Sequence, residues 1–282
     1  MTQQWRLMIH GHRTGFWNMA LDEALLEGVA AGAPPVLRFY RWRPTTLTIG
    51  YFQNSEEIHW SACTSLGIDV VRRPTGGRAI LHGEEITYSL ILPEDWPGLP
   101  SGVTASYKVL AQGIVEGLRK LGLPVDLAPQ PQGRHRRGLG DTAACFDAPC
   151  WYEVVAQGAK LVGSAQTRRR GAILQHGSIP LVSTGEVLAQ ILHFPTEKRR
   201  QAFLKMMEKR SRALRDFQPE LDFDGVWPTL ALAWSQILGF TYQPGEPTAE
   251  EKEGAEKLHN RKYAQDWWNK FGPRKGRSQI EA

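Results

Sequence analysis

A cysteine and a lysine fifteen residues apart are the side chains of this sequence best suited to covalent chemistry. Cys145 lies in a short segment that also holds Cys150, and Lys160 begins the apolar run 160–166, which is typical of a strand. A buried ammonium needs an anionic partner or a ligand. A thiolate would be one, because a nearby ammonium lowers the pKa of a cysteine below its ordinary value of about 8.5. A small, inert, buried cysteine is the alternative interpretation.

The second candidate segment is a pair of glycines, Gly76 and Gly77, between two apolar runs and next to three arginines. Paired glycines allow positive φ and a close backbone approach, and their amide N–H groups can hold an oxyanion, a phosphate or an acyl carbonyl. The segment lacks the Gly-Lys-Ser/Thr ending of a P-loop and the Gly-x-Gly spacing of a dinucleotide site. A hairpin turn is the alternative, and the arginines favour a binding site.

Metal chemistry has little support in the residue pattern. Cys145 and Cys150 are five residues apart, which is not the spacing of a redox or zinc pair, and no second pair exists. His82 and His176 are equally compatible with buried structural histidines and with ligand-facing ones. We therefore expect no metal. Because the chain has only three cysteines, we expect no disulfide framework and a reduced, cytoplasmic location.

The composition indicates a globular chain. Its 282 residues are 41% apolar and 22% charged, close to the globular average, which excludes a disordered, collagen-like or disulfide-scaffold chain. The longest apolar run, 230–234, is far shorter than the ~20 residues that cross a bilayer. Residues 1–6 contain polar and charged residues before any apolar stretch that could form the core of a signal peptide. We expect neither a membrane nor a signal peptide.

Basic residues exceed acidic ones by 34 to 29, and the excess is clustered. Such clusters attract an acidic protein, a nucleic acid or an anionic membrane, and a solvated surface is the alternative. A strand that binds nucleic acid would carry aromatic residues between its arginines. The first two clusters have none, so we expect no nucleic acid. The clusters are 134–137, 168–170, 198–200 and 209–215.

Periodicity and turn residues predict the elements that would position these side chains. Apolar residues at helical spacing, ended by Gly or Pro, indicate helices, and short β-branched or aromatic runs between turn residues indicate strands. The expected helices cover 19–31, 104–121, 184–192, 196–215, 228–238 and a segment from 248. The expected strands cover 36–42, 47–49, 68–72, 79–81, 86–92, 152–156, 160–166 and 172–180.

Local patterns add detail to this outline. Gln157-Gly158 predicts a hairpin turn just before Lys160. Pro228 is expected at the first position of its helix, and Thr248 is expected to begin a capping box. The Pro-, Gly- and Arg-rich residues 128–142 are typical of a mobile loop.

The fold class expected is α/β, of the α+β kind. No long linker separates two cores, so we expect one catalytic domain over residues 1–227. A helical C-terminal extension over 228–282 would pack on that domain and end in a disordered tail.

Several motifs in one order resemble the lipoate-protein ligase and octanoyltransferase family of the biotin/lipoate protein ligase superfamily. The cysteine motif, fifteen residues ahead of the lysine, is most similar to the octanoyltransferases of Gram-positive bacteria. The resemblance runs from about residue 5 to residue 268. The motifs are N-M-A-L-D-E from Asn18, R-R-P-T-G-G-R-A-I-L-H-G-E-E-I-T-Y-S from Arg72, C-F-D-A-P-x-W-Y-E from Cys145 and K-L-V-G-S-A-Q-T-R-R-R-G-A-I-L-Q-H-G-S-I from Lys160.

This resemblance implies a two-sheet α/β catalytic domain that works as a monomer without a cofactor. It would transfer octanoyl from octanoyl-acyl carrier protein to the lipoyl-domain lysine of the glycine cleavage system H protein. Cys145 would be the acyl-thioester nucleophile, and Lys160 would lower its pKa; Cys150 would be a second thiol beside it. The substrate-binding residues that the resemblance implies are Arg72, Arg73, Gly76, Gly77, Arg78, His82, Gly163, Ser164 and Ala165.

Two other activities on the same fold stay open. An ATP-dependent lipoate ligase would not need Cys145, and many such ligases carry a larger accessory domain than residues 228–282 provide. An amidotransferase would move octanoyl from one lipoyl domain to another by the same cysteine chemistry. The sequence separates this last activity poorly from transfer out of acyl carrier protein.

Overall fold

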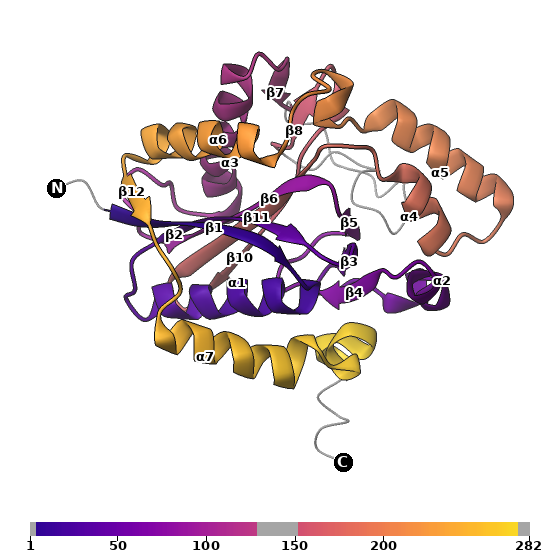
Figure 1. The fold of residues 1–282 in the computed structure, drawn as a ribbon, viewed down its shortest axis with the longest axis horizontal. Helices are drawn as coiled ribbons and strands as arrows, with labels where there is room; N and C mark the ends of the chain where they lie inside the picture. The colour runs from indigo at the N-terminus through magenta and orange to yellow at the C-terminus, as the bar shows by residue number, and fades with distance from the viewer. Residues whose placement is uncertain (1–3, 129–151, 276–282) are drawn as a thin grey trace.

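A six-stranded sheet forms the centre of the computed structural model, which describes residues 4–128 and 152–275. Its strands are β1 (Gln4–Arg13), β2 (Val36–Trp42), β6 (Glu85–Pro93), β10 (Gly163–Arg169), β11 (Ala172–Pro180) and β12 (Thr241–Pro244). They lie in the order β10-β11-β6-β2-β1-β12 (Figure 1). β1 is parallel to β2 and β12, and the other neighbours are antiparallel.

Two small sheets accompany the central one. The first contains β3 (Thr46–Ile49), β4 (Asp69–Arg72) and β5 (Ile80–His82) in the order β4-β3-β5. The second contains β7 (Val125–Leu127), β8 (Val154–Ala156) and β9 (Ala159–Lys160) in the order β7-β8-β9. The predicted α/β class with at least two sheets is confirmed, and the β7-β8-β9 sheet is an addition to the two expected.

Helices cover both faces of the central sheet. α1 and α7 lie on one face, and α3 and α6 lie on the other (Figure 1). Two π-helical turns, η3 (His259–Tyr263) and η4 (Trp267–Phe271), follow α7, and 3-10 turns occur at η1 (Ser55–Glu57) and η2 (Leu214–Asp216). The helices are α1 (Gly15–Ala30), α2 (Trp60–Ser65), α3 (Val103–Lys120), α4 (Gly185–Ile191), α5 (Glu197–Arg210), α6 (Phe223–Leu238), α7 (Ala249–Leu258) and α8 (Gly272–Lys275). None of the helices within these residues is both long and apolar enough to cross a membrane.

The alternation of side chains along β6 divides the core in two. Tyr88 and Leu90 point to one face and pack in a cluster with Trp234 of α6. Ile91 points to the opposite face, where it packs in a cluster with Leu25 of α1. Because successive strand residues face opposite ways, a strand buried on both faces reads as a continuous apolar run.

The predicted start of the helix at Pro228 is wrong. α6 begins at Phe223, where the Asp222 carboxylate accepts a hydrogen bond from the Gly225 amide at 2.8 Å, so Pro228 lies inside the helix. The expected domain boundary after residue 227 therefore falls within α6. Beyond α6, β12 pairs with β1 in the central sheet. The C-terminal part of the chain thus contributes to the same core as the rest.

The strand predicted over 160–166 is two strands in different sheets. β9 ends at Lys160, and β10 begins at Gly163 in the central sheet. The predicted turn before it is confirmed, because Gln157 and Gly158 both have positive φ, 50° and 77°, as a two-residue hairpin requires. Lys160 therefore lies where the chain passes from a small sheet to the large one.

Candidate active site

A narrow cavity lies between the central sheet and the β4-β3-β5 sheet, and we call it the inner cavity. Among the residues predicted to bind substrate, Arg73, His82, Gly163 and Ala165 meet there. The rest of its lining comes mainly from β2, β3, β6 and β11. These further lining residues are Met19, Tyr40, Trp42, Thr48, Ile80, Thr87, His176, Gly177 and Ser178.

One wall of the inner cavity carries a buried histidine–carboxylate pair, His82 and Glu85. The Nδ1 atom of His82 lies 2.7 Å from Glu85 Oε1, and its Nε2 atom lies 2.8 Å from the Thr48 hydroxyl. The ring stacks on Trp42 with 4.1 Å between centroids. Because an ionised carboxylate only accepts hydrogen bonds, the Nδ1 atom of His82 donates to Glu85. The His82 ring is held in one orientation.

A second pair, His176 and Asp22, lies deeper. Asp22 Oδ2 is 3.0 Å from His176 Nδ1, and Asp22 Oδ1 accepts a hydrogen bond from Arg38 at 2.6 Å. Burial alone would raise the pKa of Asp22, but Arg38 and the hydrogen bond from His176 outweigh it and hold that pKa below its ordinary value. Burial lowers the pKa of His176, although Asp22 opposes the shift. The sequence reading did not single out Asp22, even though it stands in the N-M-A-L-D-E motif.

The predicted glycine loop, residues 73–78, is a close-packed turn. Gly77 has φ of 94°, and a Cβ at Gly50 would lie only 1.8 Å from the Gly77 carbonyl oxygen, so neither position accepts a side chain. The Arg73 guanidinium donates to the carbonyls of Gly76 at 2.7 Å and Arg78 at 2.8 Å. Within the described residues, no acceptor receives a hydrogen bond from the amide of Gly76 or Gly77. These two amides are donors available to a ligand.

Arg72 points away from the inner cavity. Its guanidinium donates to backbone carbonyls on two sides, those of Gly50 and Gln53 on one and those of Trp268 and Asn269 on the other. Burial lowers the pKa of Arg72 to about 10. Arg72, which was expected to bind substrate, instead ties the C-terminal η4 turn to the 50–53 segment.

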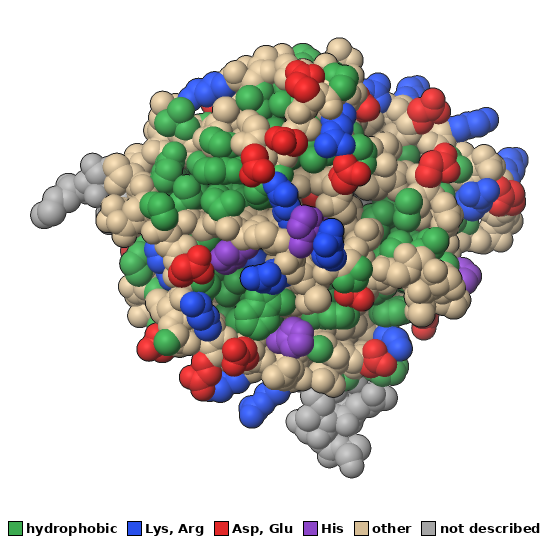
Figure 2. Space-filling view, viewed as in Figure 1, with side chains coloured by type: hydrophobic (Ala, Val, Ile, Leu, Met, Phe, Trp, Pro, Cys, Tyr) green, Lys and Arg blue, Asp and Glu red, His purple; other side chains and the backbone are tan. Residues whose placement is uncertain are grey.

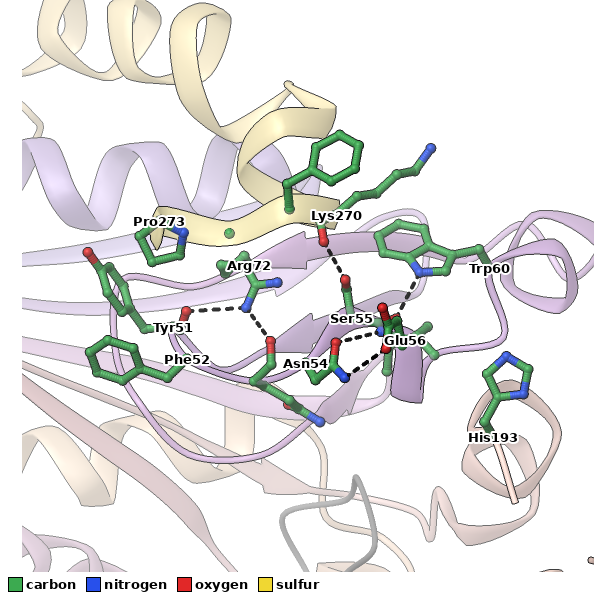
Figure 3. Close-up of a pocket in the computed structure, with 14 residues that line it drawn as sticks. Tyr51, Phe52, Asn54, Ser55, Glu56, Trp60, Arg72, His193, Lys270 and Pro273 are labelled. Atoms are coloured by element: carbon green, nitrogen blue, oxygen red, sulfur yellow. Dashed lines mark hydrogen bonds between the residues drawn. The ribbon is translucent and has the colours of Figure 1, made fainter. Parts of the chain in front are cut away.

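A larger outer cavity of about 630 Å³ lies over Arg72, between η1 and the 270–273 segment (Figure 3). Figure 3 shows the Ser55 hydroxyl directed at the Lys270 carbonyl, so that this bond joins η1 to the 270–273 segment across the cavity. A neighbouring cavity of about 470 Å³ shares Phe52, Gln53 and Asn54 with it. The predicted residues Gly76, Gly77 and Arg78 line this neighbouring cavity. The glycine loop therefore lies between the inner cavity, which Arg73 lines, and the outer ones.

Lys160 is 4% exposed and forms an ion pair with Glu153, which is 3% exposed. The pair is held by the β8–β9 hairpin and by the Arg212 amide, which donates to the Lys160 carbonyl at 2.8 Å. The sequence reading missed Glu153, although it ends the motif that begins at Cys145. Cys145 and Cys150 themselves lie outside the residues that the structure describes.

The remaining predicted residue, Ser164, sits on β10 opposite Gly177 of β11. Its hydroxyl lies 2.8 Å from the Tyr88 hydroxyl. A Cβ at Gly177 would meet Ser164 Oγ at 2.6 Å and Tyr88 Cε1 at 2.7 Å. Ser164 thus packs beside the inner cavity, whose lining includes its neighbours Gly163 and Ala165.

Two arginines of the 168–170 cluster are paired within the fold. Arg168 pairs with Glu94 at 3.2 Å, and Arg169 pairs with the buried Glu23 at 2.5 Å. The cluster therefore does not form the open basic surface that the sequence suggested. The 198–200 cluster and the start of the 209–215 cluster lie along α5, which occupies the right edge of the view in Figure 2, with acidic residues among them. The 134–137 cluster lies outside the described residues.

Comparison with known proteins places this arrangement among lipoylation enzymes. The lipoyl protein ligase A/B catalytic-domain family matches residues 14–234. The chain is 47% identical to octanoyltransferase LipM of Kyrpidia tusciae, over 95% of this chain and 98% of that one. It is 39% identical to octanoyltransferase LipM of Bacillus subtilis, over 95% and 98%. The bipartite lipoate protein ligase of Thermoplasma acidophilum has a similar structure, with a TM-score of 0.81 and 27% identity over 97% and 98% of the two chains.

Proposed function

The chain belongs to the lipoyl protein ligase A/B catalytic-domain family, and on that premise we propose that it moves octanoyl from octanoyl-acyl carrier protein to a lipoyl-domain lysine through a thioester on Cys145. It is an octanoyltransferase of lipoate biosynthesis, like the relatives that match nearly its whole length, and it acts on a lipoyl-domain protein. The acyl carrier protein donor, the glycine cleavage H protein as acceptor, the monomeric state and the cytoplasmic location are our proposals.

The observation that carries this proposal is the buried ammonium of Lys160, three residues before the cavity-lining Gly163. Burying a lysine with a carboxylate costs free energy of desolvation. We therefore infer that the charge of Lys160 has a function. Beside a thiol, an ammonium favours the thiolate. Family motifs place Cys145 fifteen residues ahead of this lysine.

The proposed reaction has two acyl transfers. The Cys145 thiolate attacks the octanoyl thioester, a new C–S bond forms, and the carrier's C–S bond breaks to release its thiolate. The neutral lysine amine of the acceptor then attacks the octanoyl-enzyme, so that a C–N bond forms, the Cys145 thiolate leaves and the nitrogen loses a proton. The amides of Gly76 and Gly77 would steady the oxyanion of each step. No ATP is consumed, because a thioester is already activated.

The inner cavity is the proposed site of the octanoyl chain. Trp42, Ile80 and Met19 give it an apolar lining. Its free volume is about 20 Å³, so an eight-carbon chain would enter only when the lining opens. Met19 is the most adaptable of these side chains, because an unbranched thioether has several low-energy conformers.

The test is transfer to purified H protein followed by mass spectrometry, with three donors supplied separately. Octanoyl-acyl carrier protein without ATP is expected to octanoylate the acceptor lysine. Modification only from free octanoate with ATP would identify a ligase instead. Modification only from an octanoylated lipoyl domain would identify an amidotransferase. Either of these two results would overturn the proposed donor.

A further inference from the structure

Thr75, His176 and Asp22 form a buried chain of hydrogen bonds that the proposed transfer does not use. The Thr75 hydroxyl lies 2.7 Å from His176 Nε2, and His176 Nδ1 lies 3.0 Å from Asp22 Oδ2. All three side chains are buried. They come from the glycine loop, β11 and α1. These hydrogen bonds therefore connect the loop to the central sheet and to α1.

Each hydrogen bond in this chain has one direction. Asp22 is ionised beside Arg38, so it accepts, and the proton of His176 sits on Nδ1. Burial keeps the His176 ring neutral, which leaves Nε2 as an acceptor. The Thr75 hydroxyl therefore donates. Tyr40 and Ser89 donate to Asp22 as well, at 2.9 Å and 3.0 Å, and fix the carboxylate from other sides.

Thr75 is held at its backbone as well as at its side chain. Its carbonyl accepts a hydrogen bond from the Tyr51 amide at 2.8 Å. The next two residues are Gly76 and Gly77, whose amides have no acceptor among the described residues. Glycines impose little conformation of their own, so their orientation depends on the residues that flank them. The Arg73 guanidinium holds the loop by donating to the carbonyls of Gly76 and Arg78. The Thr75 side chain anchors the residues just before the Gly76 and Gly77 amides.

We infer that Thr75, His176 and Asp22 are positioning residues, which fix the glycine loop so that the Gly76 and Gly77 amides face the reacting carbonyl. The part of this inference that concerns the carbonyl rests on the proposed function. The part that concerns the loop does not. Donors that stabilise an oxyanion act only when they are already oriented, so loss of the anchor would lower the rate of the chemical step more than substrate binding.

The test compares Thr75→Val, which removes the hydroxyl at nearly constant shape, with Thr75→Ser, which keeps it. Thr46→Val is the matched control, because Thr46 is also buried and its hydroxyl donates to the Pro44 carbonyl at 3.0 Å. We expect Thr75→Val to lower kcat at least tenfold with KM for the donor within twofold. Thr75→Ser should restore most of kcat, and Thr46→Val should leave kcat unchanged. A Thr75→Val enzyme with wild-type kcat would overturn the role in transfer.

A second pair of measurements separates this inference from the proposed function. Hydrogen–deuterium exchange of the 73–79 peptide, without any substrate, should be about tenfold faster in Thr75→Val than in wild type and unchanged in Thr46→Val. If the exchange rate of this peptide in Thr75→Val equals that of wild type, Thr75 does not anchor the loop, whichever acyl donor the enzyme uses. His176→Phe should have a smaller effect on kcat in the Thr75→Val background than alone, because the two residues act in one chain. If the two substitutions have fully additive effects on the activation free energy, Thr75 and His176 do not act through one chain of hydrogen bonds.

Discussion

Lys160 has a carboxylate partner, and this changes what its ammonium does to a nearby thiol. Glu153 cancels part of the field of the ammonium, so the paired lysine favours a thiolate less than an unpaired one would. The sequence reading took the thiolate itself as the anion that Lys160 needs. The structure supplies an anion whether or not the cysteine is ionised, and this anion would hold the lysine in place through both of the proposed acyl transfers.

Substitutions of Lys160 and of Glu153 should shift the pKa of Cys145 in opposite directions. Lys160→Met should raise the pH midpoint of Cys145 alkylation, and Glu153→Gln should lower it, because they remove a stabilising and an opposing charge respectively. The measurement is the rate of iodoacetamide labelling against pH, read by peptide mass. Lys205→Met, an exposed lysine of α5, is the control and should leave the midpoint unchanged. Identical midpoints in all variants would remove Lys160 from the site.

The site could be predicted from the sequence only as far as motifs and residue types reach. In the sequence, the glycine loop stands out as a glycine pair beside arginines, and Lys160 stands out as a lysine in an apolar run. His82 stands out because a histidine can face a ligand. The partners are not, because partner choice is a tertiary property. Asp22 and His176 are 154 residues apart. Nothing local to either residue indicates that they meet.

At the scale of elements, the sequence predicted strands well where a buried run lies between clear turn residues. It failed where one buried run spans two strands and where a helix begins before its strongest start signal. The 36–42 and 172–180 strands are confirmed as β2 and β11. The break between β9 and β10 was missed, because Leu161 and Val162 are buried although they pair in neither strand. The start of α6 was missed, because its cap at Asp222 lies six residues before the proline that suggested a beginning.

Arg72 shows how one side chain can hold two elements together. Its guanidinium donates to carbonyls of the 50–53 segment and of η4, and its own carbonyl accepts from the Trp268 indole at 2.7 Å. A lysine offers three donors on a single nitrogen and cannot reach both sides at once. The C-terminal turn and the 50–53 segment are therefore expected to depend on the same residue for stability.

Arg72→Lys should lower the free energy of unfolding by about 2–4 kcal/mol, because it leaves buried carbonyls without donors. Chemical denaturation measures this directly. Arg41→Lys is the matched control, because Arg41 is partly exposed and pairs with the exposed Asp224 at 3.2 Å; it should change stability by less than about 0.5 kcal/mol. Equal effects of the two substitutions would show that Arg72 does not join these elements.

At the scale of the whole molecule, α5 carries the 198–200 cluster and the start of the 209–215 cluster that the sequence showed. Six of the 14 residues of α5 are Lys or Arg and two are Glu. The residue just past its end, Ser211, forms a bridge with Lys160. A basic helix next to Lys160 is suited to steer an acidic carrier protein toward the proposed active site. α7 lies on the opposite side of the central sheet (Figure 1).

Charge reversal on α5 should therefore weaken encounter with the donor. Lys205→Glu with Lys209→Glu is expected to raise KM for acyl carrier protein about fivefold at low salt, flatten its salt dependence and leave kcat unchanged, because exposed charges are screened within about 8 Å at physiological ionic strength. Lys252→Glu with Lys257→Glu on α7 makes the same change in net charge and should have little effect. An equal rise in KM for both pairs would show that only net charge matters.

Stability should fall on mild acidification. Burial, and then the charges of Arg38 and Arg13, lower the pKa of His10 from 6.5 to about 4, and Arg38 donates to its Nδ1 atom at 3.0 Å. Between these two values the unfolded chain binds a proton that the folded chain does not, so stability is complete above pH 6.5 and decreases toward pH 4. At ~1.4 kcal/mol per pKa unit, the loss from His10 reaches up to about 3 kcal/mol. The buried His176 adds to the loss in the same direction.

Urea denaturation at pH 7, 5.5 and 4.5 checks this expectation. His10→Gln cannot be protonated, so its unfolding free energy should fall less between pH 7 and 4.5 than that of the wild type. His12→Gln is the control, because His12 is exposed on the same strand. The same pH dependence in wild type and His10→Gln would show that His10 is not the titrating group.

The central claim is that an acyl group rests on Cys145 between donor and acceptor. The most direct measurement is the intact mass of the enzyme after it is mixed with octanoyl-acyl carrier protein, without ATP and without an acceptor. We predict the added mass of one octanoyl group, removed by hydroxylamine, absent from Cys145→Ala and retained in Cys150→Ser. An octanoyl adduct that persists in Cys145→Ala, or acceptor modification by wild-type enzyme with no adduct at any time, would contradict it.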